Sequence, residues 1–253
     1  MKHSSLTKYL LYHIISATLS FRKINAEDKG KSLHQFRTSL RLVRSLLQLY
    51  NMESTFFPIP LKTFLKRTNF LRDLDVLILS LHQKSSQNIA KKLISLRNSQ
   101  YETLFTEESN IQILAAFDEL YDATSKLNPT FVDDYLIQTA YAYYEESLRE
   151  YTLLTQSTSP KELHKLRIRF KISRYAFDFL HDNGLSDSYE KIKESKGLQD
   201  KLGKIHDLHN QIKLLKTLQK QNPLNALKKL LVERKKLLKN SKLPLNLFNP
   251  PLS

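Results

Sequence analysis

Two segments of the sequence place one histidine and three basic residues at the spacing of a single helix face. The first set, here called the first stripe, is His34, Arg37, Arg41 and Arg44, and the second stripe is His164, Arg167, Lys171 and Arg174. At about 100° per residue, each set falls within an arc of roughly 80°. Arginine donates two parallel hydrogen bonds to phosphate oxygens, and crowded cations repel unless an anion neutralises them. The spacing therefore predicts two cationic helix faces that bind an acidic partner.

The two stripes belong to an internal repeat. They match at a constant offset of 130 residues, and apolar positions such as Leu33 and Leu163 match at the same offset. A second segment matches at an offset of 134, where Lys62, Asn69, Asp73, Leu74 and Ile78 meet Lys196, Gly203, Asp207, Leu208 and Ile212. Repeated polar residues in phase with repeated apolar residues indicate two helical halves of similar design.

Composition agrees with a helical protein that binds an anion. The 253 residues include only 4 Gly and 8 Pro, so strand-forming turns are scarce. Lys and Arg total 40 against 25 Asp and Glu, which gives a net charge of +15. The excess is uneven, because residues 101–150 hold 11 acidic and 2 basic side chains whereas residues 191–242 hold 15 basic and 4 acidic ones. The absence of Cys excludes disulfides, thiol nucleophiles and thiolate metal sites.

Apolar residues recur every three or four positions almost throughout, which predicts an all-α fold of about eight helices. The breaks between the expected helices fall at 51–60, 127–129, 155–160, 182–187 and 222–223. After the third break, Ser159, Pro160 and Glu162 predict a capping box at the start of a helix. We expect the first half at residues 1–154, the second at 155–243 and an extended tail at 244–253. Charged residues interrupt the apolar N-terminal stretch, so no membrane span is expected.

Other roles for the same residues remain open at this stage. The arginines could pair with local carboxylates, of which Asp73 and Asp207 are the nearest candidates. A metal-dependent helical phosphohydrolase would use a His–Asp pair, either His181 with Asp182 or His206 with Asp207, but no full ligand set is evident. Nucleic-acid binding is a further alternative, although the stripes hold few aromatic residues for base stacking.

The order and spacing of these motifs resemble the conserved histidine α-helical domain family, CHAD, over roughly residues 5–240. The resemblance rests on the stripes and on the segments around Leu71–Val76, Leu163–Tyr175 and Leu198–Asp207. It implies two pseudo-symmetric four-helix bundles packed around a basic central channel. It also implies binding of inorganic polyphosphate, without catalysis, and association with polyphosphate granules.

Carried over by matching position, the resemblance implies a set of residues that face the polyphosphate. They are His34, Arg37, Arg41, Arg44, Lys62, Arg72, His164, Arg167, Lys171, Arg174 and Lys196. Two departures affect this set, since Asn69 stands where the second half has Gly203, and His206 and His209 stand where the first half has Arg72 and Asp75. Replacing the four arginines 37, 41, 167 and 174 by Ala is expected to abolish binding and leave the helices folded.

We therefore expect a cytoplasmic, non-enzymatic protein with no catalytic residues, no cofactor and no metal. The expected partner is long-chain inorganic polyphosphate, nucleic acid is a secondary partner, and no membrane is involved.

Overall fold

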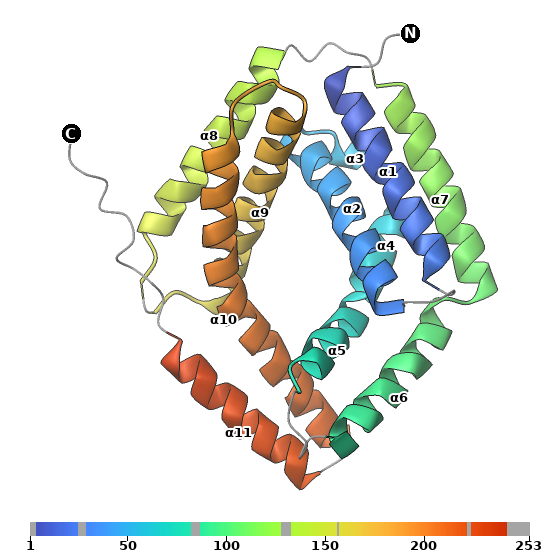
Figure 1. The fold of residues 1–253 in the computed structure, drawn as a ribbon, viewed down its shortest axis with the longest axis vertical. Helices are drawn as coiled ribbons and strands as arrows, with labels where there is room; N and C mark the ends of the chain where they lie inside the picture. The colour runs from blue at the N-terminus through green and yellow to red at the C-terminus, as the bar shows by residue number, and fades with distance from the viewer. Residues whose placement is uncertain are drawn as a thin grey trace. The chain divides into compact units, whose positions relative to one another are not determined.

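A computed structural model describes residues 4–24, 29–81, 87–127, 133–155, 157–221 and 224–241. Throughout these ranges the regular elements are helices, as Figure 1 shows. Their bounds are α1 Ser5–Lys23, α2 Lys29–Leu49, α3 Glu53–Phe56, α4 Ile59–Arg67, α5 Asn69–Leu79, α6 Gln87–Leu104, α7 Glu107–Ser125, α8 Asp133–Thr152, α9 Pro160–Asp182, α10 Tyr189–Gln221 and α11 Asn225–Asn240. The all-α prediction is confirmed.

The chain divides into two compact units, unit 1 from Met1 to Asp133 and unit 2 from Asp134 to Ser253. The division falls just after the first residue of α8, whereas the boundary expected from the sequence lies after residue 154. The reason is that α8 packs on α9. The Tyr144 ring of α8 meets Phe170 and Phe177 of α9 edge-on, with centroids 6.4 and 5.4 Å apart.

Unit 1 is organised around α1, which contacts both α2 and α7. Ser4 caps α1, because its side-chain oxygen accepts a hydrogen bond from the backbone N–H of Thr7. Aromatic rings from four helices and from the residue that follows α6 fill the core of the unit, with centroids 5.3 to 6.2 Å apart. They are Phe21, Phe36, Phe64, Phe105 and Phe117. This core holds the apolar side of α2 in place and thereby orients the first stripe.

Unit 2 is organised around α9, which packs along α10, while α11 packs on α10 from another side. Ser159 and Glu162 form the expected capping box at the start of α9. The Glu162 N–H donates to Ser159 Oγ at 3.3 Å, and the Ser159 N–H donates to Glu162 Oε2 at 3.0 Å. The buried side of α9 carries Phe170, Phe177 and Leu180, which fixes the orientation of the second stripe.

The helices are more numerous than expected, since eleven lie in the described ranges against a prediction of about eight. The segment 61–81 was expected to be one helix, but it is two, α4 and α5, joined at Thr68. The buried Thr68 hydroxyl donates to the Leu65 carbonyl at 3.0 Å, which closes α4 locally. The short α3 lies inside a segment expected to be a break, and the expected extended tail at 244–253 lies outside the described residues.

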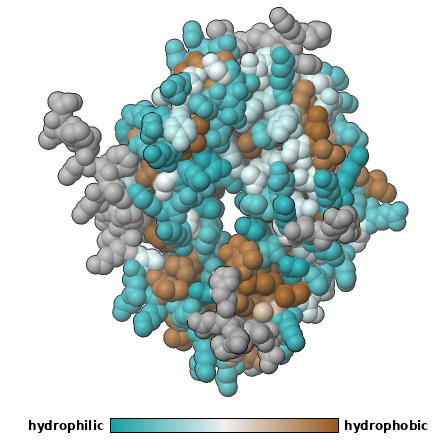
Figure 2. Space-filling view, in the orientation of Figure 1, coloured by the Kyte–Doolittle hydropathy of each residue, from teal (hydrophilic) through white to brown (hydrophobic). Residues whose placement is uncertain are grey.

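Hydrophilic side chains cover much of the face shown in Figure 2, and separate apolar patches lie among these side chains. One set of exposed apolar residues lies on a single side of α1, namely Tyr12, Ile15 and Leu19. Within the part of the chain that the structure describes, no helix is both long enough and apolar enough to span a membrane.

Candidate anion-binding stripes

The first stripe lies on α2, next to the apolar side that faces the aromatic core. His34 is exposed, and Arg41 and Arg44 are partly exposed. Arg37 differs, because only 4% of its surface is accessible. The stripe predicted from spacing is thus one buried guanidinium flanked by more accessible groups.

Arg37 is held by acceptors from the junction between α4 and α5. Its Nη1 donates to the Leu65 carbonyl at 2.9 Å and to the Thr68 hydroxyl, and its Nη2 donates to Asn69 Oδ1 at 2.7 Å. The pKa of Arg37 is lowered to about 9, chiefly by burial and next by the neighbouring charge of Arg41, whereas Asp73 opposes the shift. Arg37 still carries its charge at neutral pH. The structure therefore differs from the expectation that Arg37 faces a ligand, because its donors are used inside unit 1.

Arg41 and Arg72 bring further positive charge to the same place. Arg41 Nη2 donates to the same oxygen of Asn69 at 2.9 Å, so one amide holds two guanidinium groups. Arg72, on α5, also lowers the pKa of Arg37 through its charge. The structure thus gathers three of the predicted residues from two helices, with Asp73 as a nearby opposing charge.

Arg44 and Lys62 meet at the far end of the first stripe, where both contact Glu53 of α3. Arg44 Nε lies 2.8 Å and Lys62 Nζ 3.1 Å from Glu53 Oε1. Partial burial raises the pKa of Glu53, but hydrogen bonds from Arg44 and Lys62 outweigh it and leave the pKa below the ordinary 4.5. Glu53 could not be recognised from the sequence, because α3 was not expected and no regular spacing links Glu53 to the first stripe.

The second stripe lies on α9, and its Arg167 packs on the backbone of α10. A Cβ atom at Gly203 would lie 3.2 Å from Arg167 Nε, so the guanidinium occupies the space that a side chain would fill. This Nε is buried and has no hydrogen-bond acceptor among the described residues. Arg167 and Gly203 correspond by the repeat offsets to Arg37 and Asn69. The contact between these two positions is therefore present in both units, but only Asn69 accepts a hydrogen bond from its arginine.

The two histidines that unit 2 brings together are stacked. The ring of His164 lies over the ring of His206, with centroids 4.0 Å apart and planes 20° apart. The Asn210 amide nitrogen lies 3.1 Å from His206 Nε2. Burial lowers the pKa of the nearby His209 below the ordinary 6.5. His206 corresponds by offset to Arg72, so unit 2 has a titratable group where unit 1 has a permanent cation.

Lys171 and Arg174 both lie close to one aromatic ring in unit 2. Lys171 Nζ lies 5.3 Å and Arg174 Cζ 4.9 Å from the centroid of the Tyr175 ring, which is buried. The negative face of the ring stabilises both cations. Arg174 Nε also lies 3.7 Å from Asp178 Oδ2, and the charge of Lys196 acts on the same carboxylate.

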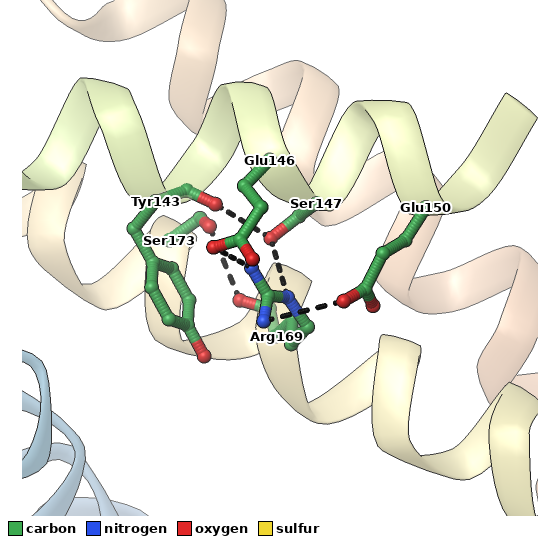
Figure 3. Close-up of polar contacts among 6 residues, drawn as sticks. All are labelled: Tyr143, Glu146, Ser147, Glu150, Arg169 and Ser173. Carbon is green, nitrogen blue, oxygen red and sulfur yellow. Dashed lines mark hydrogen bonds and ion pairs between the residues drawn. The ribbon is translucent and has the colours of Figure 1, made fainter.

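Arg169, also on α9, is a structural arginine rather than a member of the second stripe (Figure 3). It donates to Ser147 Oγ at 3.1 Å and to Glu146 Oε2 at 2.6 Å, and its Nη1 lies 3.4 Å from Glu150 Oε1. Its guanidinium also lies 4.6 Å from the centroid of the Tyr143 ring. These contacts fasten α9 to α8. Its counterpart at the repeat offset is Ser39, which agrees with a role confined to unit 2.

Nothing in the described ranges supports a metal centre, since no group of three or more His, Asp or Glu side chains is placed to hold an ion. This includes the surroundings of His181, Asp182, His206 and Asp207, all of which are described.

Comparisons with a family model and with solved structures each gave a match. The family model of the CHAD domain matches residues 15–216. The chain belongs to the CHAD family. The crystal structure of the CHAD domain from the plant Ricinus communis has a TM-score of 0.80 with this chain at 17% identity, covering 96% of this chain and 88% of the other. At this identity the likeness concerns the fold, and a comparison with curated proteins gave no match.

Proposed function

We propose that this CHAD protein binds inorganic polyphosphate through the two stripes and that it does so without catalysis. The ligand would lie along the accessible cations of each unit. Arg41, Arg44 and Arg72 supply them in unit 1, and Arg167, Lys171 and Arg174 in unit 2. The basic channel that family membership implies is part of this proposal.

The observation that carries the proposal is the crowding of guanidinium groups between α2 and α5. Arg37, Arg41 and Arg72 lie close enough that the last two lower the pKa of the first, and Asp73 opposes them. Like charges at such distances repel, and an anion that contacts them removes the repulsion. An extended chain of phosphates fits a row of cations because each phosphate carries several acceptor oxygens.

Unit 2 supports the same function by a different arrangement. The cations of Lys171 and Arg174 lie 5.3 and 4.9 Å from the centroid of the Tyr175 ring, which stabilises their positive charge. Gly203 lets Arg167 lie against α10, and no amide takes up its donors there as Asn69 does in unit 1. Partly exposed cations from this stripe would bind the phosphates of the ligand.

Binding of this kind is mainly electrostatic. Each phosphate contact releases condensed counterions, so affinity falls as the salt concentration rises. On a flexible single strand, the logarithm of the binding constant falls with the logarithm of the salt concentration with a slope of about 0.7 for each contact. The relevant experiment is a competition at physiological salt, in which labelled long-chain polyphosphate on the protein is challenged by single-stranded DNA at equal phosphate concentration. Polyphosphate that resists displacement supports the proposal. Equal displacement by DNA favours a general polyanion binder instead.

Variants connect this binding to the stripes. The double variant Arg41→Ala with Lys171→Ala removes one accessible cation from each unit and is expected to weaken binding about tenfold. It should also reduce the salt slope by about 1.4. Arg149→Ala is the control, since it removes an exposed charge of unit 2 outside the stripe. If the double variant and the control bind alike, the assignment of the stripes is wrong.

A further inference from the structure

A carboxylate lies at the corresponding end of both stripes. The repeat offsets relate Arg44 to Arg174 and Lys62 to Lys196, so each unit has one equivalent pair of an arginine and a lysine. In unit 1 this pair contacts Glu53, and in unit 2 it faces Asp178.

The two carboxylates are not equivalent in sequence. Glu53 belongs to α3 and reaches the stripe from a separate element, whereas Asp178 lies one turn beyond Arg174 on α9 itself. The residue at the repeat position of Asp178 is Gln48, which carries no charge. The two units therefore place a carboxylate beside the same cations from different positions of the chain.

The contacts in unit 1 are those that a phosphate oxygen would make. A single oxygen, Glu53 Oε1, is 2.8 Å from Arg44 Nε and 3.1 Å from Lys62 Nζ. The cations are accessible, with 34% and 53% of their side chains exposed, against 18% for Glu53. A ligand in solution can therefore reach these cations and exchange with the carboxylate.

Asp178 in unit 2 is held less tightly. Its Oδ2 is 3.7 Å from Arg174 Nε, beyond hydrogen-bond distance. Burial raises its pKa and the nearby Asp182 raises it too, while Arg174, His181 and Lys196 act in the opposite direction. For Glu53 the cations prevail over burial. The resident carboxylate of unit 2 is thus the easier of the two to displace.

We propose that Glu53 and Asp178 are resident anions that compete with ligand phosphates for the cations at the stripe ends and thereby select long polyphosphate over short. This inference rests on the proposed function. A carboxylate attached to the chain has an effective local concentration in the millimolar range or above, so a free short phosphate displaces it poorly. A long chain already bound at the middle of a stripe presents its next phosphates at a comparable effective concentration. It therefore displaces the carboxylate, and short anions do not.

The test compares the dissociation constants of tripolyphosphate and long-chain polyphosphate for the wild type and for the double variant Glu53→Gln with Asp178→Asn. Both substitutions keep the shape of the side chain and remove its charge. We expect tripolyphosphate to bind about fivefold tighter to the double variant and long chains to gain less, so that the preference for length shrinks. Glu146→Gln is the control, because Glu146 pairs with the structural Arg169, and its length preference should equal that of the wild type.

The outcomes separate the two proposals. If the wild type binds neither ligand, the proposed function fails. If the wild type binds long chains but the double variant retains the full length preference, or binds tripolyphosphate more weakly, the resident-anion inference fails alone. Circular dichroism establishes that the helices persist, and should the double variant unfold, each single variant is measured in the same way.

Discussion

Gly203 offers the sharpest test of how the second stripe is positioned. Replacing this glycine by alanine adds a Cβ atom 3.2 Å from Arg167 Nε, closer than ordinary van der Waals contact, so the guanidinium must move by a few tenths of an ångström. Gly197 lies in the same helix, and a Cβ there would meet nothing within 4 Å. The two glycines therefore form a matched pair that differs in the contact with Arg167.

The two substitutions have one effect in common and one that separates them. Alanine within a helix stabilises the folded state by about 0.5–1 kcal/mol relative to glycine, because the unfolded chain loses conformational freedom. Gly197→Ala should gain that full amount. Gly203→Ala should gain little, because strain against Arg167 opposes the gain. A displaced guanidinium loses about 1 kcal/mol of its bond to phosphate, which corresponds to roughly fivefold weaker binding.

Urea unfolding and polyphosphate titration of the two variants measure both quantities. We expect Gly197→Ala to be more stable with unchanged affinity, and Gly203→Ala to have nearly unchanged stability with about fivefold lower affinity. Equal gains in stability together with equal affinity would refute the reasoning. In that case the close approach of Arg167 to α10 would not determine its position toward the ligand.

Two further predictions concern stability. Arg37→Ala removes the three hydrogen bonds to the junction of α4 and α5 and should lower the free energy of unfolding by about 3 kcal/mol in urea titrations. Arg41 is more exposed, and Arg41→Ala should lower it by less than about 1 kcal/mol. Similar losses in the two variants would show that the burial of Arg37 does not determine its contribution to stability. Asp178→Asn should raise stability at neutral pH. The pKa of Asp178 in the folded protein exceeds the ordinary 3.8, so just above pH 3.8 this carboxyl binds more protons in the folded state than in the unfolded state. The stability of the wild type therefore falls as the pH rises through this window. Unfolding measured from mildly acid to neutral pH should show this slope in the wild type and a shallower one in the variant, and a parallel slope in both would exclude Asp178 as its source.

These predictions also correct the experiment that the sequence alone suggests. Substituting arginines 37, 41, 167 and 174 together was expected to remove binding and leave the helices folded. Because Arg37 is 4% exposed and holds the end of α4, its loss would reduce stability and affinity at once. Substitution of accessible cations alone separates the two effects.

The helical class and the capping box at Ser159 could both be predicted from sequence. Each depends on local spacing, which apolar periodicity and side-chain chemistry record directly. The burial of Arg37 could not be predicted in this way. Its position on α2 is equivalent to that of Arg167 on α9, and only the acceptors at Thr68 and Asn69, from another helix, distinguish the two.

The carboxylates at the stripe ends could not be predicted from the sequence either. Asp73 and Asp207, which repeat, were candidate partners of the arginines, and the ion pairs at the stripe ends involve two further carboxylates, Glu53 and Asp178, which do not repeat. A repeat search detects residues that two halves have kept in common. It cannot detect a similar charge supplied from different places, because that similarity exists in space and not in the alignment of the halves.

The exchange of Asn69 for Gly203 shows how two halves with the same stripe can differ in what they offer a ligand. In unit 1 the amide oxygen accepts from both Arg37 and Arg41, so it fixes their geometry and also occupies two of their donors. In unit 2 the missing side chain makes room for Arg167 and supplies no acceptor. At this position an acceptor that fixes the guanidinium groups in advance also reduces the number of donors that a ligand can use. A polyanion that contacts both stripes would meet a rigid, partly satisfied set of cations in one unit and a less constrained set in the other.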